Sequence, residues 1–141
     1  MATKDNFFQT SDGLWLYYEV TGEGRPIVLI PGFGEALTMW KYAVPVLSQR
    51  FQVVCLDPRG HGRSMKVAGN NRQKRMAQDI RELIDHLGLE DVLLVGHSLG
   101  GAIVATYAER AQSSWNDSGR CNTVWFQRCP MEPSQGQSLQ Y

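Results

Sequence analysis

The sequence lacks several features that would assign it to a specialised class of protein. Only three cysteines occur in 141 residues, too few for the disulfide framework of a small secreted protein. The 14 basic and 14 acidic side chains cancel, which gives no reason to expect nucleic acid or an anionic membrane as a partner. No apolar run approaches membrane-spanning length, and residues 1–6 lack the apolar core of a signal peptide. These absences predict a cytoplasmic chain.

The three cysteines give no clear sign of a disulfide or a metal site. Cys55 lies in the apolar run 51–56 and is expected to be a small buried residue. Cys121 and Cys129 could pair or bind a metal, but no second pair or histidine follows them, so neither role is favoured. We therefore expect no metal and no cofactor.

The first 110 residues alternate between apolar runs and amphipathic segments. The 141 residues of the sequence suffice for one domain with a core but not for two ordinary domains. The patterns predict strands at 7–10, 14–20, 26–30, 51–56 and 91–95. They predict helices at 39–47, where Pro45 favours a short or kinked helix, from the N-cap Asn71 to the C-cap Gly88, and at 99–110. Strands separated by helices indicate an α/β fold, with a mostly parallel sheet in a three-layer αβα arrangement.

The pattern changes after Arg110. Residues 111–120 follow neither the helical nor the strand period, and the remainder is rich in Ser and Gln. Residues 121–126 could form a short strand, but nothing around them continues the alternation. We therefore divide the chain into residues 1–110, part of an α/β domain, and an atypical tail, 111–141, predicted to be poorly ordered or irregular. The tail is not expected to form a further βα unit.

The most informative motif is Gly96-His97-Ser98-Leu99-Gly100, between the apolar run 92–95 and a helix-forming segment. A serine on such a sharp strand-to-helix turn has a strained backbone, and flanking glycines let neighbouring backbone approach without a Cβ clash. The motif predicts a nucleophile elbow, which presents the Ser98 hydroxyl at the positive end of the following helix. The simpler alternative is a turn serine of an ordinary βα unit.

Nucleophilic acyl transfer also needs hydrogen-bond donors for the oxyanion. One expected donor is the backbone N–H of Leu99, the residue after the serine. The second is the backbone N–H of Phe33, in the loop 31–34 that follows an apolar strand. Gly32 and Gly34 flank Phe33 and would let this backbone approach a substrate carbonyl.

The chain offers no obvious base for this serine, because His61, His86 and His97 all precede Ser98. His61 is the only one expected near the same rim of the sheet, although a loop role is simpler. His86 is expected to be a solvated residue near a helix end, and His97 to pack away from the elbow. The acidic residues after the serine are Glu109, Asp117 and Glu132. The triad acid therefore stays unknown, and no triad base is identified.

The segment 57–64 carries further charged residues, each of which could have either a catalytic or substrate-binding role or a structural role. Asp57 could act as an acid, but an aspartate at a strand end more often fixes the following loop through hydrogen bonds. Arg59 and Arg63 could contact an anionic substrate, although solvated or ion-paired loop arginines are commoner.

Three motifs, in this order, resemble the amino-terminal half of α/β hydrolases of the serine hydrolase group, which includes esterases, lipases, lactonases and haloperoxidase-like proteins. They are Pro31-Gly32-Phe33-Gly34, Asp57-Pro58-Arg59-Gly60-His61-Gly62-Arg63-Ser64 and Gly96-His97-Ser98-Leu99-Gly100-Gly101. The resemblance covers residues 7–110 and implies a partial α/β-hydrolase fold with the first five or so strands. It also implies hydrolysis of an ester, lactone or similar bond in a small molecule through an acyl-enzyme.

The same resemblance implies a triad order of Ser, acid and His, from which this chain departs. We therefore expect a truncated hydrolase with impaired catalysis. The alternatives are a non-catalytic α/β-hydrolase-like binding protein and a truncated product without function. If the strand 92–95 has no further neighbour, its open edge predicts self-association, unless residues 124–126 cover it.

Overall fold

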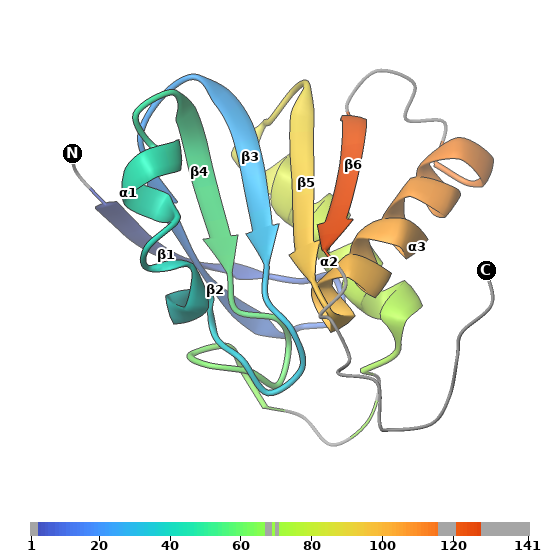
Figure 1. The fold of residues 1–141 in the computed structure, drawn as a ribbon. Helices are drawn as coiled ribbons and strands as arrows, with labels where there is room; N and C mark the ends of the chain where they lie inside the picture. The colour runs from blue at the N-terminus through green and yellow to red at the C-terminus, as the bar shows by residue number, and fades with distance from the viewer. Residues whose placement is uncertain (1–2, 67–68, 70, 116–120, 128–141) are drawn as a thin grey trace, which may run out of the picture.

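The computed structural model describes residues 3–66, 69, 71–115 and 121–127. Its centre is a six-stranded sheet in the order β1-β2-β4-β3-β5-β6 (Figure 1). The strands are β1 (Thr3–Gln9), β2 (Trp15–Thr21), β3 (Arg25–Ile30), β4 (Phe51–Leu56), β5 (Val92–His97) and β6 (Cys121–Gln127). β2 is antiparallel to β1 and β4, whereas β4, β3, β5 and β6 run parallel.

The helices cover both faces of this sheet, and the predicted αβα layering is confirmed. They are the 3₁₀ helix η1 (Leu37–Trp40), α1 (Val44–Leu47), α2 (Gln73–Leu87) and α3 (Leu99–Ser113). On β3, Val28 and Ile30 belong to the core beneath α2 and α3, whereas Ile27 and Leu29 belong to the core beneath η1 and α1. Because strand side chains alternate between faces, this apolar run fills both cores. No described helix has the length and apolar character needed to cross a membrane.

The helix α2 begins and ends close to its predicted limits. Gly88 adopts the left-handed conformation, with φ 63° and ψ 34°, as expected for a C-cap glycine. The N-cap is Arg72, without a side-chain capping bond, rather than the predicted Asn71. Asn71 instead lines a pocket described below.

The helix predicted over 39–47, which Pro45 was expected to shorten or kink, is not continuous. The structure has two short elements, η1 and α1, joined by a turn. Pro45 stands in the first turn of α1, where its missing N–H costs nothing. A helix running through this position would lose a hydrogen bond and meet the proline ring, so the chain starts a new helix there.

Residues 121–127 form a strand, the possibility that the sequence left open for 121–126. α3 continues to Ser113, and β6 lies parallel to β5, with Leu94 opposite Val124 and Gly96 opposite Phe126. β5, α3 and β6 therefore form a βαβ unit, and β6 covers the edge of β5. The predicted irregularity of the tail at 116–120 and 128–141, with Cys129, lies outside the described residues, as does the side chain of Cys121.

Candidate active site

Ser98 occupies the junction of β5 and α3, with φ 54° and ψ −113°. A positive φ is uncommon for a residue with a Cβ, and among the described non-glycine residues only Asp91 shares it. Such strain persists only where the surrounding structure enforces it. The residue is exposed, at the carboxyl end of β5 and the N-terminus of α3.

Gly96 and Gly100 make this tight turn sterically feasible. A Cβ added at Gly96 would collide with the backbone of Gly100 and Gly101, and a Cβ added at Gly100 would collide with the carbonyl group of Ile30. These obstacles are backbone atoms of α3 and of the end of β3, which cannot move aside as a flexible side chain would. Both positions therefore require glycine.

The loop after β3 lies directly against the elbow. A Cβ at Gly32 would stand 3.3 Å from the Cβ of Ser98. Phe33 follows Gly32 and Leu99 follows Ser98, so the two expected oxyanion donors lie on adjoining segments. Gly34 has φ 75°, a conformation that favours glycine, which lets the loop turn away after Phe33.

Asp57 holds the two loops at this rim of the sheet together. The side chain is 2% exposed, and its carboxylate accepts hydrogen bonds from the backbone N–H of Leu37 at 2.7 Å and of Arg63 at 3.0 Å. Gly62 packs so closely that an added Cβ would collide with the carboxylate. The loop-fixing interpretation of Asp57 is therefore confirmed.

Arg59 is buried in a network of charges, and its guanidinium is bound by carboxylates of the protein. Its Nε and Nη2 donate to Asp79 at 2.6 and 2.8 Å, and its Nη1 donates to Asp12 at 3.0 Å. Burial opposes the charge of the guanidinium, but the hydrogen bonds to Asp79 and Asp12 raise its pKa above the ordinary value. Arg75 joins the network through Asp79 at 2.9 Å. The ion-paired interpretation of Arg59 is confirmed.

Arg63 is also engaged within the protein. Its Nη1 donates to the hydroxyl of Tyr17 at 2.8 Å, and its guanidinium lies 4.9 Å from the centre of the same ring.

Cys55, on the neighbouring strand β4, is 3% exposed, as predicted. Burial and the nearby charges of Glu19 and Asp57 raise the pKa of its thiol to about 12, which leaves it unreactive.

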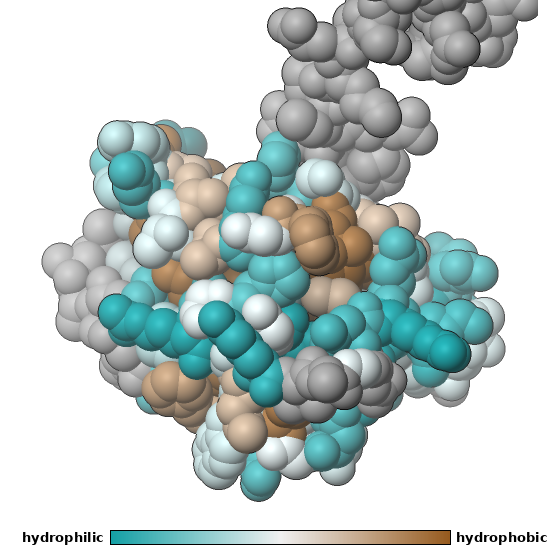
Figure 2. Space-filling model, turned by 90° about the horizontal axis from the view of Figure 1, so that it is seen from below, coloured by the Kyte–Doolittle hydropathy of each residue, from teal (hydrophilic) through white to brown (hydrophobic). Residues whose placement is uncertain are grey.

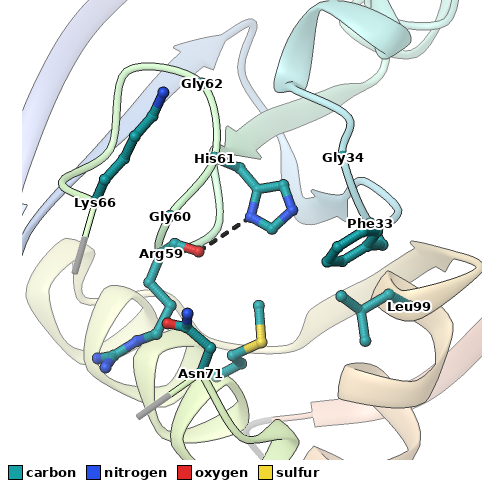
Figure 3. A pocket seen from close by; sticks show the side chains of 10 residues that line it. Phe33, Gly34, Arg59, Gly60, His61, Gly62, Lys66, Asn71 and Leu99 are labelled. Atoms are coloured by element: carbon teal, nitrogen blue, oxygen red, sulfur yellow. Dashed lines mark hydrogen bonds between the residues drawn. The ribbon is translucent and has the colours of Figure 1, made fainter. Parts of the chain in front are cut away.

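A pocket of about 410 Å³ opens beside the elbow (Figure 3). Phe33 and Leu99, the expected oxyanion residues, both line it, and Phe33 is 80% exposed. The other lining residues are Gly34, Arg59, Gly60, His61, Gly62, Lys66, Asn71 and Met76. Figure 2 looks onto the molecule from this end, where the parallel strands finish, and shows apolar surface set among polar side chains.

The structure keeps His86 and His97 out of this pocket. His97 ends β5 and lies, by the alternation of the strand, on the sheet face of η1 and α1, with Nδ1 3.7 Å from a carboxylate oxygen of Glu35. His86 is exposed on the last turn of α2 and stacks on Phe8 with 5.6 Å between ring centres. In the described part of the chain, no hydrogen bond joins the Ser98 hydroxyl to a histidine, and no three His, Cys, Asp or Glu side chains gather as a metal site.

Comparison with known sequences identifies relatives of this chain. Residues 25–132 match the family model of the alpha/beta hydrolase fold. The chain is 40% identical over 105 residues to a non-heme haloperoxidase from Rhodococcus erythropolis, covering 74% of this chain and 38% of that protein. It is 35% identical over 97 residues to a soluble epoxide hydrolase from Corynebacterium sp. (strain C12), covering 69% of this chain and 34% of that protein.

Solved structures share the fold. A bromoperoxidase from Bacillus anthracis superimposes with a TM-score of 0.78 at 31% identity, and an esterase from Exiguobacterium antarcticum with 0.79 at 29%. Each match covers 87% of this chain and 44% of the other. The chain thus spans less than half the length of these relatives. With its elbow and its sheet order, the chain belongs to the α/β-hydrolase fold family.

Proposed function

We propose that this chain carries the nucleophile and the oxyanion donors of a serine hydrolase that cleaves an ester, lactone or similar bond. The observation that carries the proposal is the strained backbone of Ser98, with φ 54° at the start of α3. A strained serine conformation at a strand-to-helix turn supports a nucleophile, because it directs the hydroxyl toward bound substrate.

The reaction would proceed through an acyl-enzyme. The Ser98 oxygen attacks the substrate carbonyl carbon while its proton passes to a base, and the carbonyl oxygen becomes an oxyanion. The backbone N–H groups of Leu99 and Phe33 would stabilise this charge, at about 2.7–4 kcal/mol for each donor. Collapse of the intermediate expels the alcohol, and water then hydrolyses the ester formed on Ser98.

The serine favours carbonyl substrates over the epoxide in the name of one relative. Attack of a hydroxyl on an epoxide carbon, or on a carbon that carries a halogen, produces an ether, which water does not readily cleave. Attack on a carbonyl carbon produces an ester, which water cleaves and which regenerates the serine. The nucleophile at position 98 therefore supports acyl transfer.

The sequence has no histidine after Ser98 that could serve as the base of a triad. Loss of the histidine from a serine triad costs about 10⁶ in turnover. Oxyanion donors and binding retain about 10³–10⁴ over water. We therefore propose that this chain by itself turns over slowly, and that a base supplied from outside would accelerate acylation of Ser98.

Labelling with a fluorophosphonate in the presence and absence of imidazole tests this proposal. We expect a slow covalent adduct at Ser98, located by peptide mass spectrometry, which forms faster when imidazole acts as the base. Ser98→Ala should form no adduct at this position, whereas Ser114→Ala, which removes an exposed serine at the other end of α3, should label like the wild type.

A second candidate function is a non-catalytic binding protein. It is favoured by the lack of a hydrogen bond between Ser98 and any histidine among the described residues. If imidazole produces no adduct at Ser98 while the pocket still binds small molecules, the binding function replaces the hydrolase.

A further inference from the structure

His61 is the pocket residue whose hydrogen-bonding state follows from the structure. Its Nδ1 lies 3.0 Å from the backbone carbonyl oxygen of Arg59. A carbonyl oxygen can only accept a hydrogen bond, so Nδ1 must carry the hydrogen. In the neutral ring, Nε2 then holds a lone pair and is an acceptor.

The anchor of this ring is rigid. Arg59 is 1% exposed, and its side chain is held by Asp79 and Asp12, so the carbonyl that fixes His61 has little freedom. The backbone N–H of His61 also donates to the carbonyl of Pro58 at 2.9 Å, which closes the turn. Both the ring position and its tautomer are therefore set before any ligand binds.

The surroundings of the ring favour a neutral ligand. The ring meets Phe33 edge to face, with 5.7 Å between ring centres, and Leu99 lines the same pocket. Figure 3 shows the guanidinium of Arg59 and the ammonium of Lys66 pointing away from the His61 ring. A carboxylate placed beside neutral His61 would face the lone pair of Nε2, with neither cation directed toward it.

We propose that His61 is a specificity-determining residue whose Nε2 accepts a hydrogen bond from a hydroxyl or N–H group of the substrate. The apolar part of that substrate would pack against Phe33 and Leu99. The inference rests on the proposed function, because it takes the pocket beside Ser98 as the substrate site. It narrows the substrate class to neutral esters or lactones that carry a hydrogen-bond donor.

The tautomer is tested first, without any ligand. A long-range ¹H–¹⁵N correlation spectrum of the ¹⁵N-labelled chain at about pH 8.5, above the ordinary histidine pKa, reports which ring nitrogen is protonated. We expect protonated Nδ1 and unprotonated Nε2 for His61, with the signals assigned by their loss in His61→Phe. A ring protonated at Nε2 would overturn the proposal.

Binding of two probes tests the specificity. The probes are 4-methylphenol and 4-methylanisole, which share a ring but differ in the donor hydroxyl. We expect 4-methylphenol to bind about threefold to tenfold more tightly, the range of one net hydrogen bond. His61→Phe, which keeps a ring but lacks the acceptor, should abolish this preference, whereas His61→Gln, with an amide oxygen as acceptor, should retain it.

Equal affinities of the two probes for the wild type, or an unchanged preference in His61→Phe, would overturn the role of His61. Circular dichroism checks that both variants fold. If one variant is unfolded, the comparison of the two probes on the wild type still tests the proposal. Neither measurement needs turnover. A failure to label Ser98 would therefore refute the hydrolase while leaving the result for His61 interpretable.

Discussion

Arg59 and Asp79 form a bidentate ion pair in the interior of the protein, with contacts of 2.6 and 2.8 Å and side chains that are 1% and 3% exposed. Asp12, in the turn between β1 and β2, accepts two further hydrogen bonds from Arg59, at 3.0 and 3.1 Å. The pair thereby joins that turn, the loop after β4 and α2. The loop after β4 also carries His61, so this network supports one wall of the pocket.

Removing one charge of this pair should strongly destabilise the fold. Asp79→Asn would leave the buried guanidinium of Arg59 with only part of its partners, at a cost of about 3–5 kcal/mol in the free energy of unfolding. Urea denaturation measures this change. The control is Asp91→Asn in the pair with Arg25, whose side chains are 51% and 38% exposed, and for which we expect about 0–1 kcal/mol. Equal losses in the two variants would contradict the prediction.

Asp12 should make the stability of the fold sensitive to acid. The hydrogen bond from Arg59 outweighs the effect of partial burial and holds the pKa of Asp12 well below its usual 3.8. A carboxyl group whose pKa is lower in the folded state stabilises the fold above its unfolded pKa, and this contribution is lost as the pH falls. Wild-type stability should therefore fall more steeply than that of Asp12→Asn between about pH 5 and about pH 2.

Urea denaturation at a series of pH values tests this difference. Asp79 acts in the opposite direction, because burial raises its pKa against the hydrogen bonds from Arg59 and Arg75. Since Asp79 is present in both proteins, the comparison isolates Asp12. Parallel pH dependences for the wild type and Asp12→Asn would refute the assignment.

Ser98→Gly should stabilise the protein. Backbone strain at a non-glycine residue in this region costs about 1–3 kcal/mol, which glycine relieves. Glycine also makes the unfolded chain more flexible, and the larger loss of entropy on folding costs about 0.5–1 kcal/mol. We expect a net gain of about 1 kcal/mol in thermal or urea unfolding. Ser98→Ala keeps the Cβ and should bring no such gain, so an equal effect of the two substitutions would argue against strain. Both variants should lose fluorophosphonate labelling at this position.

Gly100→Ala should disrupt the elbow, because the new Cβ would collide with the carbonyl of Ile30. We expect a loss of about 3 kcal/mol or more in unfolding free energy, at or beyond the usual cost of overpacking. Gly13→Ala is the control, because Gly13 has φ 91° but open space around it, so only backbone strain of about 1–2 kcal/mol applies. A smaller loss for Gly100→Ala than for Gly13→Ala would refute the close packing.

Much of the fold follows from local patterns. The apolar runs 26–30 and 51–56 are strands because they are short and fill both cores, and Gly88 ends α2 through its left-handed conformation. The predicted elbow agrees with the strained backbone of Ser98, although its role as a nucleophile stays a prediction. These features depend on residues within one or two turns of each other, so the sequence pattern indicates them directly.

β6 shows where local patterns fail. Its isolated run of apolar residues has no continuing alternation, and only the free edge of β5 makes it a strand. Pro45 indicated that the helix over 39–47 is short or kinked, but the local residues did not fix where the chain breaks between η1 and α1. In both places the neighbouring structure decided between two conformations that the local residues allow.

The sequence by itself determined the family, most of the strands and helices up to residue 110, and the serine at the elbow, because periodicity and glycine spacing act over a few residues. Only the tertiary structure decided that Arg59 forms ion pairs with carboxylates of the protein and that the Nδ1 of His61 is hydrogen-bonded to a backbone carbonyl. Arg59 meets Asp12 across 47 residues of chain and Asp79 across 20. The side chains left to face the pocket depend on such long-range pairs, which no local pattern encodes.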